Sequence, residues 1–180
     1  MLNVLPNILT ICRGLAGPLI LLLVHPFDLH TAAFWVFIGA ILTDLIDGTV
    51  ARALGATSTL GQTLDPIADK VLGNFTWVTI GLAGWAPPWL VILVLIRDLA
   101  VIVGFVFNGL RMESPNIPGR LMVSVEGVAL PVLLFRHDWM STDWPSVGVI
   151  LGTISLTLGV ASAAAYGWQV WEKRQRVLHA

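Results

Sequence analysis

The fold is decided by the stretch Asp44-Leu-Ile-Asp47-Gly48-Thr-Val-Ala51-Arg52, an eight-residue gap, and then Gly61-Gln-Thr-Leu-Asp65-Pro-Ile-Ala-Asp69. It places four carboxylates among residues that are otherwise almost all apolar or small. The first block repeats its motif residues at i, i+3, i+4, i+7 and the second at i, i+4, i+8, so each block shows them on one helical face. Two such helices facing each other would form an oxygen cage suited to hard divalent cations.

The composition indicates an integral membrane protein. Of 180 residues, 56% are hydrophobic and 12% are charged, about half the usual globular share of roughly 25%. The mean hydropathy is +0.83. A net charge of -1 predicts no broad basic surface and therefore no nucleic-acid partner. The single cysteine, Cys12, excludes an intramolecular disulfide framework.

Apolar segments follow one another along the chain, each near the length of roughly 20 residues that a bilayer requires. No internal repeat or long linker separates them, so we expect one membrane domain over residues 1–180. The expected fold is all-α, a bundle of six transmembrane helices. The segments are 8–24, 31–53, 64–83, 89–110, 119–135 and 146–170. Residues 1–6 are expected to form an amphipathic stretch on the membrane interface before the first span.

Basic residues predict the orientation of the bundle. In a six-span arrangement one side carries only Arg136 near a loop, and the other side carries seven basic residues near segment ends. We therefore expect both termini and the carboxylate-bearing helix ends in the cytoplasm. Tryptophans near the segment ends match the aromatic belts of a membrane protein. The basic residues on the cytoplasmic side are Arg52, Lys70, Arg111, Arg120, Lys173, Arg174 and Arg176.

Four carboxylates in an apolar setting require neutralisation. One charged side chain at the bilayer centre costs roughly 2.5–3.5 kcal/mol on insertion scales. Helix–helix hydrogen bonds or ion pairs are the alternative explanation, but only Arg52 and Lys70 lie close by in sequence. One or two bound divalent cations therefore explain the cluster best.

A cation held there would bind a pyrophosphate and stabilise the leaving phosphate. Gly48 and Gly61 would let a nucleotide approach the helices, although small residues also serve plain helix packing in membranes. Arg52 is placed to grip a phosphate, with topology and snorkelling as its alternative role. Asp69 lies furthest into its helix; in an apolar wall it would suit the task of accepting a proton from an attacking hydroxyl.

The spacing resembles the signature of the CDP-alcohol phosphatidyltransferase family, Asp-x-x-Asp-Gly-x-x-Ala-Arg, a gap, and Gly-x-x-x-Asp-x-x-x-Asp. The resemblance implies a six-helix membrane enzyme, often homodimeric, that uses Mg²⁺ or Mn²⁺. It implies that Asp44, Asp47 and Asp65 bind the metal and that Asp69 is the catalytic base, which also touches the second ion. The nucleotide-contacting positions of the family fall on Asp47, Gly48, Ala51, Arg52 and Gly61.

The acceptor side of the site is less defined. Four arginines are expected to form a pocket for an anionic acceptor. For Arg97, an internal salt bridge with the neighbouring acid of the fourth segment is the alternative role. Glu126, inside the fifth segment, is expected to pair with either Arg97 or Arg120. The fifth segment opens with Arg120 where glycerol-type synthases often carry Ser-Lys-x-x-Thr, which leaves the acceptor open. The four arginines are Arg13, Arg97, Arg111 and Arg120, and the neighbouring acid is Asp98.

The run Pro6-Asn7-x-Leu9-Thr10-x-x-Arg13 resembles the opening of bacterial phosphatidylglycerophosphate synthases and related cardiolipin synthases. We therefore expect transfer of a phosphatidyl group from CDP-diacylglycerol to glycerol 3-phosphate with release of CMP, in a bacterial cell membrane and among membrane lipids. A cardiolipin synthase that uses phosphatidylglycerol is the close alternative. A small cation transporter is the alternative of another class, but it would distribute its acids over more helices near the bilayer midplane.

Overall fold

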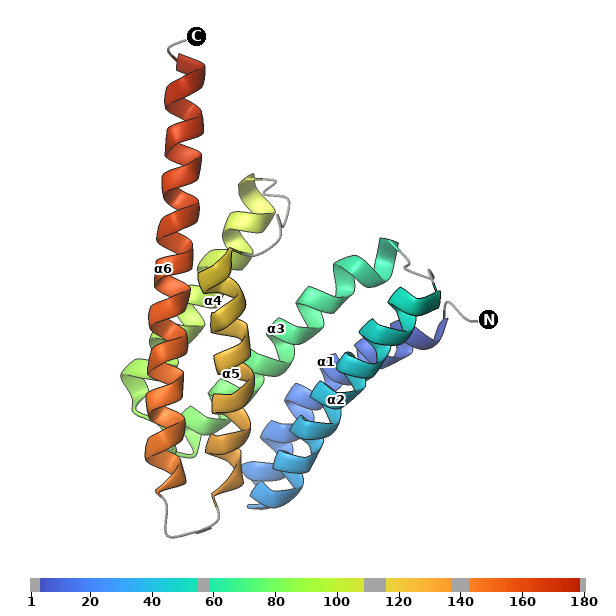
Figure 1. Ribbon diagram of the computed structural model, residues 1–180. Helices are drawn as coiled ribbons and strands as arrows, with labels where there is room; N and C mark the ends of the chain where they lie inside the picture. Colours follow the sequence, from blue (N-terminus) through green and yellow to red (C-terminus); the bar gives the residue numbers. More distant parts are fainter. Residues whose placement is uncertain (1–3, 55–58, 109–115, 137–142, 179–180) are drawn as a thin grey trace.

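The computed structural model describes residues 4–54, 59–108, 116–136 and 143–178, except for the side chains of 4–8, 45–54, 59–66, 104–108, 169–174 and 176–178. This part of the chain is all-helical (Figure 1). Its helices are α1 (Val4–Val24), α2 (His30–Leu54), α3 (Thr59–Leu82), α4 (Pro88–Asn108), α5 (Ile117–Phe135) and α6 (Trp144–Leu178). Each expected segment falls in its own helix. α1 begins at Val4, so the described part of the stretch expected over residues 1–6 is helical and continuous with the first span, and its place on the membrane interface stays a prediction.

Successive helices reverse direction (Figure 1). The turn between α1 and α2, the turn between α3 and α4, and the end of α5 meet at one end of the molecule. There the ring of Trp85 lies edge-on to His30, with 6.4 Å between centroids, and the Arg136 guanidinium stands 4.9 Å from the Trp85 ring centroid. The C-terminal part of α2 and the N-terminal part of α3 therefore lie toward the opposite end.

The core consists of apolar side chains from all six helices, with the most extensive contacts between α5 and α6 and between α1 and α3. Gly17 permits the close approach of α1 to α3. A Cβ atom at this position would lie 3.0 Å from Phe75 Cβ and 3.1 Å from the Val71 carbonyl oxygen. Arg13 precedes Gly17 by one helical turn and is thereby carried against α3.

Two hydrogen-bonded caps set the starts of α5 and α6. The Asn116 side chain accepts from the Gly119 backbone N–H at 2.9 Å and from the Ser162 hydroxyl at 2.6 Å, which ties the start of α5 to α6. Asp143 accepts from the hydroxyl and backbone N–H of Ser146, and these two hydrogen bonds lower the pKa of Asp143. The caps place both helix starts without relying on the apolar core.

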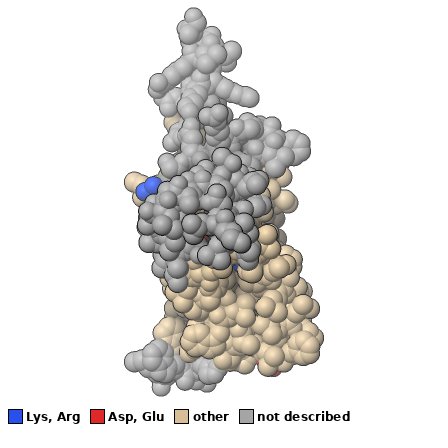
Figure 2. Space-filling view, turned by 90° about the vertical axis from the view of Figure 1, so that its right-hand side faces the viewer, with Lys and Arg blue, Asp and Glu red and all other residues tan. Residues whose placement is uncertain are grey.

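The outer surface of the bundle is largely apolar. Figure 2 shows a face whose described part is covered almost entirely by residues other than Lys, Arg, Asp and Glu. Within the described residues, two helical stretches are long and apolar enough to cross a membrane, Ile117–Phe135 and Trp144–Trp168. Leu9–Val24 and His30–Asp44 are shorter apolar helices. Large exposed apolar side chains on the other helices include Leu15, Trp35, Trp89 and Ile96.

Candidate active site

Three helices bring charged side chains together around Arg13, whose side chain is only 5% exposed. Its Nη1 pairs with Asp44 Oδ1 on α2, and its Nε lies 2.9 Å from Asp69 Oδ1 on α3. A guanidinium is planar and presents donors in two directions, which suits a bridge between two carboxylates. We call these three residues the carboxylate centre.

The carboxylate centre joins the two sequence blocks across space. Asp44 opens the first block and Asp69 closes the second, and one guanidinium contacts both. The other predicted residues lie within α2 and α3, but their side chains are outside the described residues: Asp47, Gly48, Ala51, Arg52, Gly61 and Asp65. Among the side chains that the structure describes, no group of three or more His, Cys, Asp and Glu could hold a metal ion. The metal and nucleotide roles of this set therefore stay predictions.

The donor set at this centre nevertheless fits a divalent cation. Asp44 and Asp69 come from different helices and supply carboxylate oxygens, the ligands that Mg²⁺ and Mn²⁺ prefer. Both carboxylates contact one guanidinium, so a positive charge lies between them in this structure. The sequence left ion pairing open as an alternative to metal binding, and Arg13 provides such a pair from a helix far away in sequence.

Asp69 does not lie in an apolar wall, and that expectation is wrong. Its side chain is 55% exposed, and it contacts the Arg13 guanidinium. The reason is the close packing of α1 on α3, which brings a cation from α1 to this face. An exposed carboxylate is accessible to a hydroxyl substrate, so the proposed role as a base keeps its geometric requirement.

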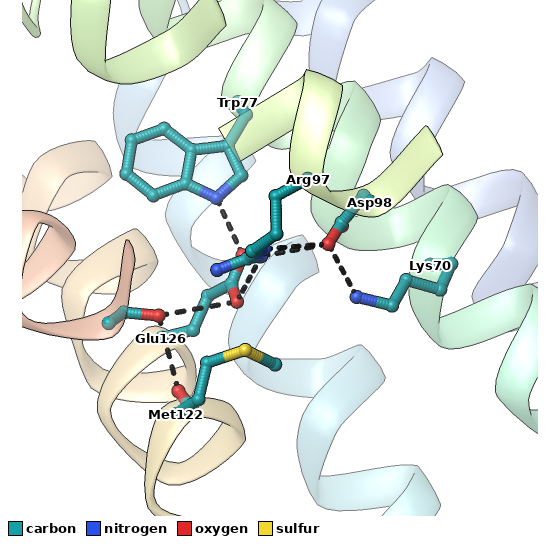
Figure 3. A network of polar contacts seen from close by, with 7 residues as sticks. Lys70, Trp77, Arg97, Asp98, Met122 and Glu126 are labelled. Carbon is teal, nitrogen blue, oxygen red and sulfur yellow. Dashed lines mark hydrogen bonds and ion pairs between the residues drawn. The ribbon is translucent and has the colours of Figure 1, made fainter. Parts of the chain in front are cut away.

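A second group of charges lies inside the bundle and is shown in Figure 3. Lys70 Nζ donates to Asp98 Oδ1 at 2.7 Å, and Arg97 Nε donates to the same oxygen at 3.0 Å. Arg97 Nη2 lies 3.0 and 3.3 Å from the two carboxylate oxygens of Glu126. We call this group the ion-pair network; it consists of Lys70, Trp77, Arg97, Asp98, Glu126 and Ser155.

Neutral side chains complete the network. Trp77 Nε1 donates to Glu126 Oε1 at 2.7 Å, and the Ser155 hydroxyl lies 3.4 Å from Glu126 Oε2. The four charged residues sum to zero, with two cations and two anions. Removing one member of a buried pair leaves an uncompensated charge, which typically costs about 3–5 kcal/mol. The network therefore resists rearrangement.

The structure resolves the partners that the sequence left open. Glu126 pairs with Arg97, whereas Arg120 is exposed at the start of α5. Arg97 forms the internal salt bridge with Asp98 that was weighed against acceptor binding. Two more arginines were expected in the acceptor pocket. Arg13 belongs to the carboxylate centre, and Arg111 lies outside the described residues. The described arginines share no common partner, and the acceptor pocket stays a prediction.

Sequence reasoning missed the bridging position of Arg13 and the roles of Lys70 and Trp77. Lys70 directly follows Asp69, so its place beside the second block was visible in the sequence. The contact between Trp77 and Glu126 spans 49 residues, and no local pattern indicates it. Glu126 carried the useful signal, because a lone acid in an apolar helix requires a partner.

Gly159 on α6 makes room for Arg97 and supplies a test of the network. A Cβ atom there would lie 2.7 Å from Arg97 Cδ and 2.9 Å from Met122 Sδ. Gly159→Ala should therefore lower the free energy of unfolding by about 1–3 kcal/mol through overpacking. The thermal midpoint of the purified protein in detergent measures this effect. Gly127→Ala is the matched control, because a Cβ atom there meets nothing within 4 Å. Equal midpoints for the two variants would contradict the packing described here.

Comparison with known proteins identifies the family of the chain. The family model of CDP-alcohol phosphatidyltransferases matches residues 3–163. A Bacillus subtilis relative named CDP-diacylglycerol--glycerol-3-phosphate 3-phosphatidyltransferase is 27% identical over 97% of this chain and 96% of its own length. A Mycobacterium tuberculosis protein named probable phosphatidylglycerophosphate synthase is 36% identical over 70% of this chain and 63% of its own. A Drosophila melanogaster protein named probable cardiolipin synthase (CMP-forming) is 31% identical over 86% of this chain and 47% of its own. The chain therefore belongs to the CDP-alcohol phosphatidyltransferase family.

Proposed function

We propose that this enzyme transfers a phosphatidyl group from CDP-diacylglycerol to glycerol 3-phosphate and releases CMP, with Mg²⁺ or Mn²⁺ as cofactor. The observation that carries the proposal is the convergence of Asp44 and Asp69, from the two motif blocks, on one point between α1, α2 and α3. The Bacillus subtilis relative supports glycerol 3-phosphate as the acceptor, since the similarity covers nearly the whole of both chains.

The reaction requires one bond to form and one to break. The acceptor hydroxyl oxygen bonds to the phosphorus of the phosphatidyl group, the bond from that phosphorus to the CMP oxygen breaks, and the hydroxyl proton passes to Asp69. A divalent cation, when bound, supplies positive charge at the pyrophosphate. Asp44, Asp47 and Asp65 would hold it, Asp69 would also touch a second ion, and Arg52 would grip a donor phosphate. Arg13 offsets one of the two negative charges of Asp44 and Asp69, which reduces the repulsion between the carboxylates.

A cardiolipin synthase is the second candidate. The relative from Drosophila melanogaster and a fusion protein from Schizosaccharomyces pombe carry cardiolipin synthase (CMP-forming) in their names. This chain covers 47% and 16% of those two proteins. The longer shared length with the Bacillus subtilis relative favours glycerol 3-phosphate. A small cation transporter is disfavoured, because the chain belongs to a family of transferases.

An acceptor panel tests the proposed reaction. Purified protein with Mg²⁺ would receive CDP-diacylglycerol labelled in the cytidine, together with glycerol 3-phosphate, phosphatidylglycerol or no acceptor. We expect labelled CMP only when glycerol 3-phosphate is present. Release that requires phosphatidylglycerol would identify a cardiolipin synthase instead. Absence of CMP with every acceptor would contradict the transferase function itself.

The membrane arrangement is part of the proposal. Six antiparallel helices with apolar outer surfaces would each cross a bacterial cell membrane, with both termini and the carboxylate centre on the cytoplasmic side. Two of these helices meet the length and hydropathy of a span among the described residues, and the described parts of α1 and α2 include shorter apolar stretches. The homodimer implied by the family resemblance stays a prediction.

Cysteine labelling tests this topology. In a Cys12→Ser background, Phe27→Cys places a thiol in the α1–α2 turn and Ile117→Cys places one at the start of α5; both native side chains are well exposed, at 66% and 75%. In intact cells we expect a membrane-impermeant maleimide to label position 27 and to label position 117 only after permeabilisation. Labelling of both positions in intact cells would exclude the six-span arrangement.

A further inference from the structure

Two consecutive residues of α3 connect the carboxylate centre to the ion-pair network. In a helix, neighbouring residues point about 100° apart. Asp69 faces α1, where its Oδ1 lies 2.9 Å from Arg13 Nε. Lys70 faces α4, where its Nζ lies 2.7 Å from Asp98 Oδ1. Any rotation of α3 that moved Lys70 away from Asp98 would also move the Asp69 carboxylate.

Asp98 is a fixed anchor for Lys70. The residue is 2% exposed, and its Oδ1 atom also accepts from Arg97 Nε at 3.0 Å. Arg97 is bound in turn by Glu126 of α5. Residues of α4 and α5 therefore hold the carboxylate that receives Lys70. Figure 3 shows Lys70 at one end of this chain of contacts and Trp77 at the other.

The chain of contacts returns to α3 at its far end. Trp77 is fully buried on α3, and its Nε1 donates to Glu126 Oε1 at 2.7 Å. Lys70 and Trp77 are separated by seven residues, which places them two turns apart on one face of the helix. Contacts at both points constrain the rotation of α3 and also its position along its axis. A single ion pair would constrain the rotation and the axial position of α3 less tightly.

We propose that Lys70 and Asp98 are positioning residues for the carboxylate centre, because their ion pair sets the rotation of α3 and thereby the place of the Asp69 carboxylate. This inference rests on the proposed function for the identity of the centre. It differs from a purely stabilising role, since it predicts that loss of the pair weakens divalent-cation binding. It also differs from an acceptor-binding role, since the partners of Lys70 and Arg97 are buried carboxylates.

The first measurement is the affinity of the purified protein for Mn²⁺, determined by electron paramagnetic resonance in the absence of lipid substrate. Lys70→Met and Asp98→Asn should each weaken Mn²⁺ affinity, by no more than the roughly 10–100-fold that loss of a direct outer partner of a metal ligand causes. The double variant should bind Mn²⁺ no more weakly than the single variant with the lower affinity, because both substitutions remove the same ion pair. Lys70→Arg should restore most of the affinity, since it retains the charge and a donor.

Matched controls separate positioning from stability. Leu134→Ala removes a fully buried side chain on α5 and should lower the thermal midpoint without changing Mn²⁺ affinity. Ser155→Ala removes a hydroxyl from the network without touching α3, and it should leave Mn²⁺ affinity unchanged. Trp77→Phe removes the second contact of α3 and should weaken Mn²⁺ affinity less than Lys70→Met does.

The outcomes are distinct from those of the acceptor panel. If Lys70→Met and Asp98→Asn bind Mn²⁺ as the unchanged protein does while their thermal midpoints fall, the pair is only structural and the proposal is wrong. If the unchanged protein transfers phosphatidyl groups but binds no Mn²⁺, the proposal is also wrong. Absence of CMP release with normal Mn²⁺ binding in the unchanged protein would instead contradict the proposed function alone.

Discussion

Asp69→Asn should lower the rate of phosphatidyl transfer by about 10²–10⁴-fold, the usual contribution of general base catalysis. Asparagine keeps the shape of the side chain but cannot accept the hydroxyl proton. The carboxylate is half-exposed and held by Arg13, so the substitution affects an accessible group and not a core packing residue. Binding of CDP-diacylglycerol should persist, and the loss should appear in kcat. Transfer rates and donor binding measured on the folded variant check this expectation.

Two further variants interpret the result. Asp28→Asn changes an exposed acid in the α1–α2 turn, at the end of the molecule away from the centre, and its activity should be unchanged. The backbone φ of 51° at this position is one that asparagine adopts readily. Asp44→Asn should weaken metal binding, so that excess metal recovers part of the rate. Near-normal turnover of Asp69→Asn would mean that another group takes the proton.

Chelation should abolish activity altogether, and Mg²⁺ or Mn²⁺ should restore it. The reason is the charge of the two motif blocks, which carry four carboxylates on two helices that both pack against α1. Arg13 offsets only one of these charges, and a divalent cation held by the carboxylates would supply positive charge at the pyrophosphate. Release of CMP in the presence of EDTA, and after titration with each metal, measures the effect.

EDTA already saturated with Mg²⁺ is the control for effects of the chelator on the lipid or detergent, and it should leave the rate unchanged. Full activity after removal of all divalent cations would overturn the metal centre. In that case the ion pairs with Arg13 would be the interactions that stabilise the Asp44 and Asp69 carboxylates.

Local pattern was sufficient to predict the helices. Segments of about 20 apolar residues, separated by short polar or Gly-Pro turns, specify most helix ends to within five residues, but α6 continues to Leu178 where the expected segment ends at residue 170. The motif spacing also specified which residues share a helical face, because the helical period is a local property. Family membership follows from the same short blocks, and the family match agrees.

Contacts between helices required the tertiary structure. The pair of Arg13 with Asp44 joins residues 31 apart, and the pair of Arg97 with Glu126 joins residues 29 apart. Each charged residue had several candidate partners on other helices. Sequence spacing does not indicate which of these partners it contacts. The expected surroundings of Asp69 were wrong for this reason, since the sequence around it contains apolar residues but the packing of α1 supplies a guanidinium.

The sequence by itself therefore determined the helical segments, the faces on which the carboxylates lie and the family of the chain, all of which depend on order and period along one helix. Only the tertiary structure decided that Arg13 bridges the two motif helices and that Lys70 is tied to Asp98. These pairings depend on how closely the helices approach and at which rotation they pack. That approach is set by small residues such as Gly17, whose missing side chain allows α1 and α3 to meet.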